Sequence, residues 1–368
     1  MTAPARARGL IDVPHSCAYS RVKRRASLSR PTVHDIAREA GVSLATVDRV
    51  LNARPGVREK TIAKVHAAVE RLGYVRDTYA ANLARQRQYR FVFILPEGPS
   101  QFAQTIKSAL QEAYASHIAD RTLLKVVRVP QQDPHAIVAA LQSLNVDRLD
   151  GIALMVPETP QVRDAVSRLK DAGLAVVTLV SDLPNSRRDY FIGVNSVAAG
   201  RTAALLMGRF VRSGGEILVV TNSMRSRDSL ERRLGFDDVM SRDFSDLVVL
   251  PSIEAYDDPA RMERVITEVA SGRERLVGIY SMGSGNSTLL AALRRSGRLG
   301  ELIVIAHELT PTTRQALLEN EIAAVIAQNV GHLVRSALRV LRNICDDLPI
   351  FEAQERVRIE IVLRENLP

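Results

Sequence analysis

Residues 31–52 combine a helical hydrophobic pattern with signals for the ends of two short helices. Their apolar positions recur every three or four residues and would line one face of each helix: Val33, Ile36, Ala37 and Ala40, then Val47, Val50 and Leu51. Thr32 and Asp35 have the spacing of a capping box that starts the first helix. Gly41 would end it, because glycine adopts a left-handed backbone conformation without steric cost, and Ser43 offers a hydroxyl to cap the second helix.

A third helix is expected after a loop at 53–56, which contains a Pro-Gly step. It covers roughly 59–72, ends at Gly73 and has its apolar positions at the same helical spacing: Ile62, Val65, Val69 and Leu72. The second helix keeps an outward face that this three-helix core does not use: Leu44, Ala45, Asp48, Arg49 and Asn52. The arrangement is that of a helix-turn-helix, whose second helix enters the major groove of DNA. The alternative is a helical hairpin that only packs.

From residue 91 onwards the pattern changes to short β-branched runs that alternate with amphipathic helices. The strand-like runs are 91–95, 123–129, 151–156, 174–180, 216–220, 247–250, 276–280 and 302–305. Helical patterns between them include 102–114, 162–169, 198–211, 261–269 and 287–295. Strands that alternate with helices form parallel sheets through right-handed crossovers. There are too many units for one such sheet, so we expect two α/β lobes with a ligand cleft between them, at the carboxyl ends of the strands.

Charge separates the first part of the chain from the rest. Residues 1–90 hold 18 of the 50 Lys and Arg residues and 7 of the 41 Asp and Glu residues, a net charge of +11. The remainder has 32 basic and 34 acidic residues, a net charge of −2. A basic head on a near-neutral body indicates a DNA-binding module joined to another domain. A basic tail with a solvated helical face explains residues 21–25 equally well, but not the pattern after residue 30.

Composition also bears on the compartment. We find no apolar run near the roughly 20 residues that span a bilayer, and the N-terminus lacks the apolar core of a secretory signal. Cys17 and Cys345 have no metal-ligand or CxxC spacing, so both are expected to be free thiols. We expect a cytoplasmic, nucleoid-associated protein without membrane contact. Residues 1–30 lack periodicity and are expected to form a disordered basic tail; the alternative is an upstream start that the cell does not use.

Residues 32–74 resemble the headpiece of the lactose-repressor (LacI) family of bacterial transcription regulators. The motif positions that carry the resemblance are Asp35-Ile-Ala, Ala40-Gly-Val-Ser43, Thr46-Val, Arg49-Val, Asn52 and Leu72-Gly-Tyr74. The body resembles the family's sugar-binding regulatory domain, which is related to periplasmic sugar-binding proteins. The resemblance implies an all-α helix-turn-helix headpiece followed by an α/β, two-lobed periplasmic-binding-protein-like domain with parallel sheets.

The resemblance also implies domain boundaries. They are a tail (1–30), a headpiece (31–76), a hinge helix or linker (77–89) and an effector-binding domain (90–368), with one lobe at 90–194 and 328–350 and the other at 195–327 and 351–368. The chain would cross between the lobes near Asn195, Gln328 and Phe351.

Carried over by position, the family implies contacts to DNA. Leu44, Ala45 and Arg49 would face base edges, and the guanidinium can bond guanine in bidentate fashion. Ser43, Thr46 and Asn52 would lie against phosphates. Leu83 matches a leucine that the family inserts into the minor groove, although the Pro-Asn that precedes this hinge helix is Arg76-Asp77 here, and an ordinary linker is the alternative. Asp48 departs from the family's small hydroxyl residue, and either orients Arg49 or accepts from a cytosine amino group.

The same resemblance implies an effector site. Arg232 stands three residues before a Gly-aromatic pair, where the family keeps an arginine that bonds sugar hydroxyls; Arg233 could take that role. Further candidates are Phe102, Asp182, Asn195, Asn286 and Gln328. The family's usual Asn-Asp is replaced by Met282-Gly283, which puts the effector class in doubt, although a sugar or polyol remains favoured.

The sequence therefore predicts a homodimeric repressor of a near-palindromic operator, controlled by a small carbohydrate-like effector as inducer or corepressor. We expect no enzyme, no catalytic residues, no cofactor and no metal: phosphate-binding, dinucleotide-binding, zinc-protease and nucleophile-elbow motifs are missing from the sequence. The alternatives are a periplasmic-type solute-binding protein and a transcriptional activator of the same architecture.

Overall fold

The computed structural model describes residues 31–51, 54–74, 87–98, 100–117, 121–256, 258–283 and 285–368. The chain divides into two compact units, Met1–Ala81 and Asn82–Pro368. We call residues 31–74 the headpiece and residues 87–368 the body, and describe each by itself.

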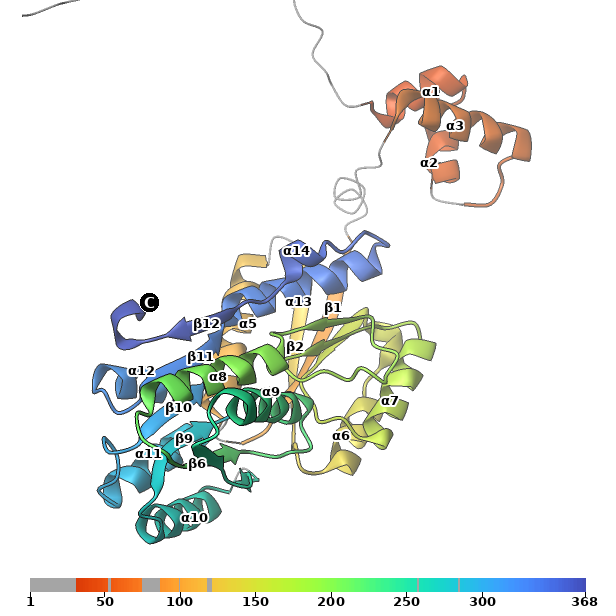
Figure 1. Cartoon of the computed structure of the whole chain (residues 1–368). Coiled ribbons are helices and arrows are strands. Elements are labelled where there is room, and N and C mark those ends of the chain that lie inside the picture. The colour runs from red at the N-terminus through yellow and green to blue at the C-terminus, as the bar shows by residue number, and fades with distance from the viewer. Residues whose placement is uncertain are drawn as a thin grey trace, which may run out of the picture. The chain divides into compact units, whose positions relative to one another are not determined.

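The headpiece consists of the helices α1 (Val33–Ala40), α2 (Leu44–Leu51) and α3 (Glu59–Leu72) (Figure 1). Their shared core contains Ile36, Val47, Val50, Val65 and Ala68. The apolar spacing of the sequence therefore predicted the three helices and, except for Ala68, the buried residues that join them.

The predicted helix ends of the headpiece are confirmed. The backbone N–H and the hydroxyl of Thr32 donate to the Asp35 carboxylate at 2.9 and 2.7 Å, which completes the capping box and lowers the pKa of Asp35. Gly41 follows α1 with a φ of 66°. The Ser43 hydroxyl accepts from the N–H of Thr46 at 3.2 Å, at the start of α2.

The body contains two sheets. The first is formed by β1 (Tyr89–Pro96), β2 (Thr122–Val129), β3 (Gly151–Leu154), β4 (Ala175–Leu179) and β5 (Tyr190–Ile192). Its strand order is β2-β1-β3-β4-β5 and every pair is parallel.

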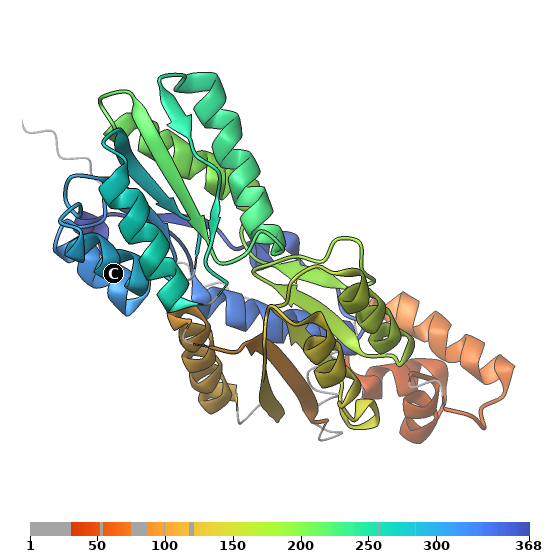
Figure 2. The same ribbon diagram turned by 90° about the horizontal axis from the view of Figure 1, so that it is seen from below.

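The second sheet is formed by β6 (Gly215–Thr221), β7 (Leu247–Val249), β8 (Ile253–Glu254), β9 (Leu276–Ser281), β10 (Ile303–His307), β11 (Ala324–Gln328) and β12 (Ile359–Val362). The order is β12-β11-β10-β9-β6-β7, with β8 paired to β6. Its pairs are parallel except for the antiparallel edge strand β12. The predicted α/β fold with two parallel sheets is confirmed (Figure 2).

Helices cover both faces of each sheet. The first sheet is flanked by α5 (Gln101–His117) and α13 (Val330–Cys345) on one face and by α6 (Pro134–Gln142) and α7 (Pro160–Asp171) on the other. The second is flanked by α8 (Ser196–Phe210) and α9 (Arg227–Asp243), and on its other face by α10 (Pro259–Gly272), α11 (Asn286–Arg295) and α12 (Pro311–Leu318). Three short helical elements complete the body: η2 (Val146–Arg148), α14 (Glu352–Glu355) and η3 (Arg364–Asn366). Each sheet with its helices is one lobe.

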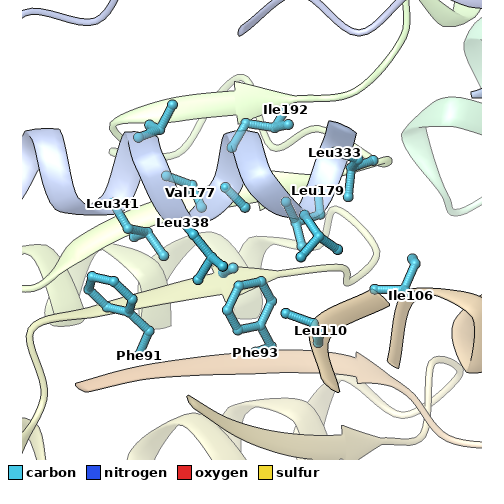
Figure 3. Close-up of a cluster of buried hydrophobic side chains, with 14 of the residues drawn as sticks. Phe91, Phe93, Ile106, Leu110, Val177, Leu179, Ile192, Leu333, Leu338 and Leu341 are labelled. Atoms are coloured by element: carbon cyan, nitrogen blue, oxygen red, sulfur yellow. The ribbon is translucent and has the colours of Figure 1, made fainter. Parts of the chain in front are cut away.

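Strand β1 shows why these layers form. Phe91 and Phe93 point into the core beneath α5 and α13 (Figure 3). Val92 and Ile94 belong to the core beneath α6 and α7. A strand that is buried on both faces needs apolar residues at consecutive positions, which is the run that the sequence shows.

The chain passes between the lobes at 193–195, at 329 and at 356–358. The carboxyl ends of the parallel strands in both lobes face one cavity. Within the described ranges, every helix is too short or too polar to cross a lipid bilayer.

Candidate functional site

Helix α2 presents the side chains predicted to face DNA bases. Leu44 is 42% exposed, and Ala45 and Arg49 are exposed beside it. The hydroxyls of Ser43 and Thr46, the predicted phosphate contacts, lie 2.9 Å apart at the start of this helix. Among the described residues predicted to face bases, Arg49 is thus the cationic one.

Asp48 has a partner within the headpiece that the sequence did not suggest. Its carboxylate pairs with the guanidinium of Arg54 at 3.1 Å, and both side chains are more than half exposed. The N–H of Arg54 also donates to the carbonyl of Arg49 at 2.8 Å. Arg54 is therefore bonded to α2 through both its backbone and its side chain. An ion pair this exposed adds little stability, but it partly neutralises the carboxylate on a surface predicted to face phosphates.

Two predicted DNA contacts, Asn52 and Leu83, lie outside the described residues, as do the tail and residues 77–86 of the predicted hinge. Their roles remain predictions.

The cavity between the lobes has a volume of about 190 Å³. The first lobe contributes the ends of its strands and the start of α5, including Gln101, Phe102 and Val180. The second lobe contributes the first turns of α9, α10 and α11 and the residues after β10. It also supplies the charged lining that the structure describes: Asp228, Arg232, Asp258 and Glu308.

Arg232 is held in place at the cavity by three partners. Its Nη1 donates to the carbonyl oxygen of Met282 at 2.5 Å and lies 3.4 Å from the Asp228 carboxylate, and its Nη2 donates to Glu308 at 3.4 Å. The residue is 2% exposed. Met282 stands where the family usually has a polar side chain, and here its backbone carbonyl fixes the arginine instead.

Glu308 is an acid of the cavity with a shifted pKa. It is buried, and burial raises its pKa to about 7, although Arg232 and Gln328 oppose the shift. Its backbone has a φ of 70°, in the left-handed region that few non-glycine residues adopt. Val180, which lines the opposite lobe, has a φ of 64°.

Glu308 and the two residues bonded to it, Arg232 and Gln328, each have one buried polar atom without a hydrogen-bond partner among the described residues. These atoms are Nε of Arg232, Oε2 of Glu308 and Oε1 of Gln328. Gln328 uses its amide nitrogen to donate to Glu308 Oε1 at 2.9 Å. One donor and two acceptors are therefore left, and buried polar groups rarely stay unpaired.

The predicted effector residues fall into two groups. Phe102, Arg232 and Asn286 line the cavity, and Gln328 lies directly behind it through its bond to Glu308. The Asn286 side chain is already bonded, because it accepts from the Ser281 hydroxyl at 2.6 Å and donates to the His307 carbonyl at 3.0 Å.

The remaining two predicted residues do not line this cavity. The Asp182 carboxylate pairs with Arg188 at 2.5 and 2.6 Å and accepts from the Thr178 hydroxyl. The Asn195 side chain caps α8 by accepting from the N–H of Ala198 at 2.9 Å. Both have local partners, and their use by a ligand would need a rearrangement.

Sequence reasoning missed Asp228 and Glu308. Glu308 comes directly after the end of a buried strand, which was the signal available, because such positions gather at the cavity edge. Asp228 lies one helical turn before Arg232 on the same face of α9. The sequence gave no reason to assign Asp228 to the cavity before the position of Arg232 was known.

Both lobes also touch across the cavity mouth. Gln101 Nε2 donates to the Thr312 hydroxyl at 2.8 Å, and the N–H of Arg227 donates to the Ser181 hydroxyl at 3.1 Å. In the part of the chain that the structure describes, no group of His, Cys, Asp and Glu residues is placed to hold a metal ion.

Comparison with protein families matches both units. Residues 32–77 match the bacterial regulatory proteins of the lacI family. Residues 91–348 match the periplasmic binding protein domain. Catabolite control protein A of Priestia megaterium is 28% identical over 164 residues, which are 43% of this chain and 48% of that protein. The HTH-type transcriptional regulator RegA of Clostridium saccharobutylicum is 39% identical over 93 residues, 25% of this chain and 27% of that protein. The chain therefore spans less than half of the length of each of these two curated relatives.

Solved structures share the fold of the body. The glucose-galactose binding protein GanP of Geobacillus stearothermophilus has a TM-score of 0.68 at 16% identity and covers 77% of this chain and 99% of its own. A solute-binding protein of Burkholderia graminis in complex with D-arabinose has a TM-score of 0.68 at 23% identity, with 76% and 96% covered. At these identities the likeness shows the fold alone.

Proposed function

We propose that this protein is a sequence-specific DNA-binding transcription regulator. The chain belongs to the periplasmic binding protein domain family and has a lacI-family regulatory region before that domain. A small carbohydrate-like effector in the interlobe cavity would control it. We further propose that it is a repressor that acts in the cytoplasm, at the nucleoid. A homodimer suits this role, because two recognition helices related by a twofold axis would read a near-palindromic operator.

The observation that carries this proposal is the buried group of Arg232, Glu308 and Gln328. Its unpaired atoms include both a donor and acceptors. A hydroxyl group donates and accepts at once, so neighbouring hydroxyls on one ligand can pair with Arg232 and Glu308, which line the cavity, in front of Gln328. A phosphate dianion only accepts, and it would also face the carboxylates of Asp228 and Glu308. An uncharged sugar or polyol therefore fits better than a sugar phosphate.

The reading surface supports the DNA side of the proposal. Arg49 is exposed between core positions of α2, where a guanidinium can reach guanine O6 and N7. Asn52 would add a phosphate contact and Leu83 a minor-groove wedge after it. An effector would release or strengthen DNA binding by changing the lobe geometry and, with it, the hinge.

A thermal-shift panel on the full-length protein tests the effector side. The panel holds D-galactose, D-arabinose, D-allose, D-tagatose, myo-inositol and galactose 6-phosphate, because a ligand that binds the folded state raises its melting temperature. We expect a shift from an uncharged member, its loss in Arg232→Ala, and its retention in Arg233→Ala. Arg233 is the matched control because it points to Asp237 and Ser252 instead. A shift with the phosphate alone, or one that survives Arg232→Ala, contradicts the cavity assignment.

A transport-type solute-binding protein is the rival function, since the body shares its fold. Retention on DNA separates the two. The proposed regulator holds a palindromic duplex at moderate salt, and a transport protein releases it.

A further inference from the structure

We propose that the cavity holds an acetamido group of its ligand, so that the effector is an N-acetylated amino sugar rather than a plain hexose. The inference rests on the proposed function, because it names the class of sugar that the same cavity takes. The residues that carry it lie around the connection from β9 to α11, where Gly283 and Gly285 both line the cavity.

Gly283 leaves space at the cavity wall. A Cβ atom placed on Gly283 would meet one atom within 4 Å, Nη1 of Arg232 at 3.8 Å. A Cβ atom placed on Gly285 would lie 2.9 Å from Cε of Met262, so the methyl group of this methionine packs behind the second glycine. Met262 and Ala255 are buried and also line the cavity. We call Ala255, Met262, Gly283 and Gly285 the glycine notch, which has room beside Arg232 and apolar groups around it.

Hydrogen-bond donors lie next to the glycine notch. Gly285 is the N-cap residue of α11 and has no side chain that could cap the first turn. The first N–H groups of an α-helix lack a partner within the helix, so those of α11 remain for a ligand. Arg232 adds a donor, because its Nε is buried without a partner among the described residues, while its Nη1 donates to the carbonyl of Met282. A carbonyl oxygen in the notch can accept from these groups.

The charges around the glycine notch favour a neutral substituent. Asp228, Asp258 and Glu308 line the cavity and repel an anion. An ammonium group is disfavoured in turn by Arg232 and by the positive ends of α9, α10 and α11, whose first turns line the cavity.

A secondary amide is neutral and combines one acceptor with one donor. Its carbonyl suits the N–H groups of α11, and its N–H suits a carboxylate such as Glu308, whose Oε2 is unpaired among the described residues. Its methyl group is the part that a hydroxyl lacks, and the thioether of Met262 offers an adaptable apolar contact for it. An acetamido group therefore matches the space, the donors and the charge of the notch together.

The test compares sugars that differ in one substituent, by titration calorimetry on the full-length protein. The pairs are D-glucose with N-acetyl-D-glucosamine, D-galactose with N-acetyl-D-galactosamine, and D-mannose with N-acetyl-D-mannosamine. In at least one pair we expect the acetamido sugar to bind about tenfold or more tightly than the hexose, the lower range for one extra apolar group in a fitted pocket. The free amino sugar and the uronic acid of that pair should bind more weakly than the acetamido sugar.

Gly283→Val tests the location, because its side chain would fill the open space of the notch. The ratio of the two affinities in that pair should fall to less than about twofold, since the pocket for the extra group is gone. Gly272→Val is the matched control: a Cβ atom there meets nothing within 4 Å, and Gly272, at the end of α10, is not among the residues that line the cavity. Its ratio should equal that of the parent.

Hexoses that bind as tightly as their acetamido partners overturn this inference and leave the proposed function intact. Tighter binding of the free amino sugar or the uronic acid overturns it as well, and so does a folded Gly283→Val that keeps the parent's ratio. Should Gly283→Val not fold, Gly283→Ala replaces it, because its Cβ atom would lie at an ordinary contact distance from Arg232 and still narrow the notch. Absence of binding by every sugar overturns the effector side of the proposed function together with this inference.

Discussion

At the scale of single residues, two side chains of the cavity stand on strained backbone. Glu308 and Val180 both have positive φ angles, and a β-branched residue such as Val180 rarely tolerates that conformation. Such strain costs about 1–3 kcal/mol per residue and persists only where the surroundings enforce it, most often at functional sites. Local sequence gave no sign of it, because the strain comes from the packing of whole elements.

Glu308→Gln should change how stability depends on pH. In the wild type the pKa of Glu308 is about 7 in the folded state, against an ordinary value near 4.5. The folded state thus keeps a proton that the unfolded state has lost, so this residue's contribution to the free energy of unfolding decreases as the pH rises from 4.5 to 7 and is constant above.

Melting temperatures of the two proteins from pH 4 to 9 check this. The wild type should lose stability relative to the variant across that interval, and the difference should be level above it. The lowered pKa of His307 acts in the opposite direction, but His307 is present in both proteins and largely cancels. A difference that is flat with pH would contradict the assignment.

Arg49→Ala should weaken specific DNA binding by about 1–3 kcal/mol and relax the base preference at one position of each half-site. Selection from a random duplex pool measures the preference, and titration measures the affinity. Arg38→Ala is the control, because Arg38 lies on α1 and pairs with Asp35. An unchanged preference profile in Arg49→Ala would remove this residue from base reading.

At the scale of elements, the sequence predicted long and strongly patterned segments well. The expected third helix at 59–72 is α3, and the expected strand runs correspond to strands of the two sheets. The expected runs did not include β5 and β8, whose three and two residues are too few to show a pattern, nor β11. The roles of Asp182 and Asn195 were harder to predict, since whether an acid or amide after a strand faces a ligand or a local partner depends on tertiary contacts.

Thr32→Ala should destabilise the headpiece by about 0.5–2 kcal/mol, the usual cost of losing an N-cap. Hydrogen exchange of peptides from residues 33–51, measured by mass spectrometry on the full chain, should become faster. Thr267→Ala on α10 should leave those peptides unchanged, because its hydroxyl donates to the carbonyl of Glu263 within the body. Equal exchange in wild type and Thr32→Ala would show that the capping box does not stabilise α1.

At the scale of the whole molecule, the chain joins a helix predicted to read DNA to a body whose two lobes line a small cavity. The contacts between Gln101 and Thr312 and between Ser181 and Arg227 hold the lobes together at its mouth. Regulation then requires that the ligand and DNA each bind one arrangement of these lobes more tightly than another. The ligand then changes the affinity for DNA by the same factor as DNA changes the affinity for the ligand. Sequence alone indicated both sites, but not the contacts that hold the two lobes together at the cavity.

The most direct measurement is the affinity of the full-length protein for a duplex selected from a random pool, with and without the uncharged sugar that raises its melting temperature. The account predicts that this sugar changes the affinity of the wild type by about 5- to 150-fold. In Arg232→Ala the affinity without sugar should match the wild type, and the sugar should have no effect. Equal affinities with and without sugar in the wild type, or no retention of any duplex, would contradict the account.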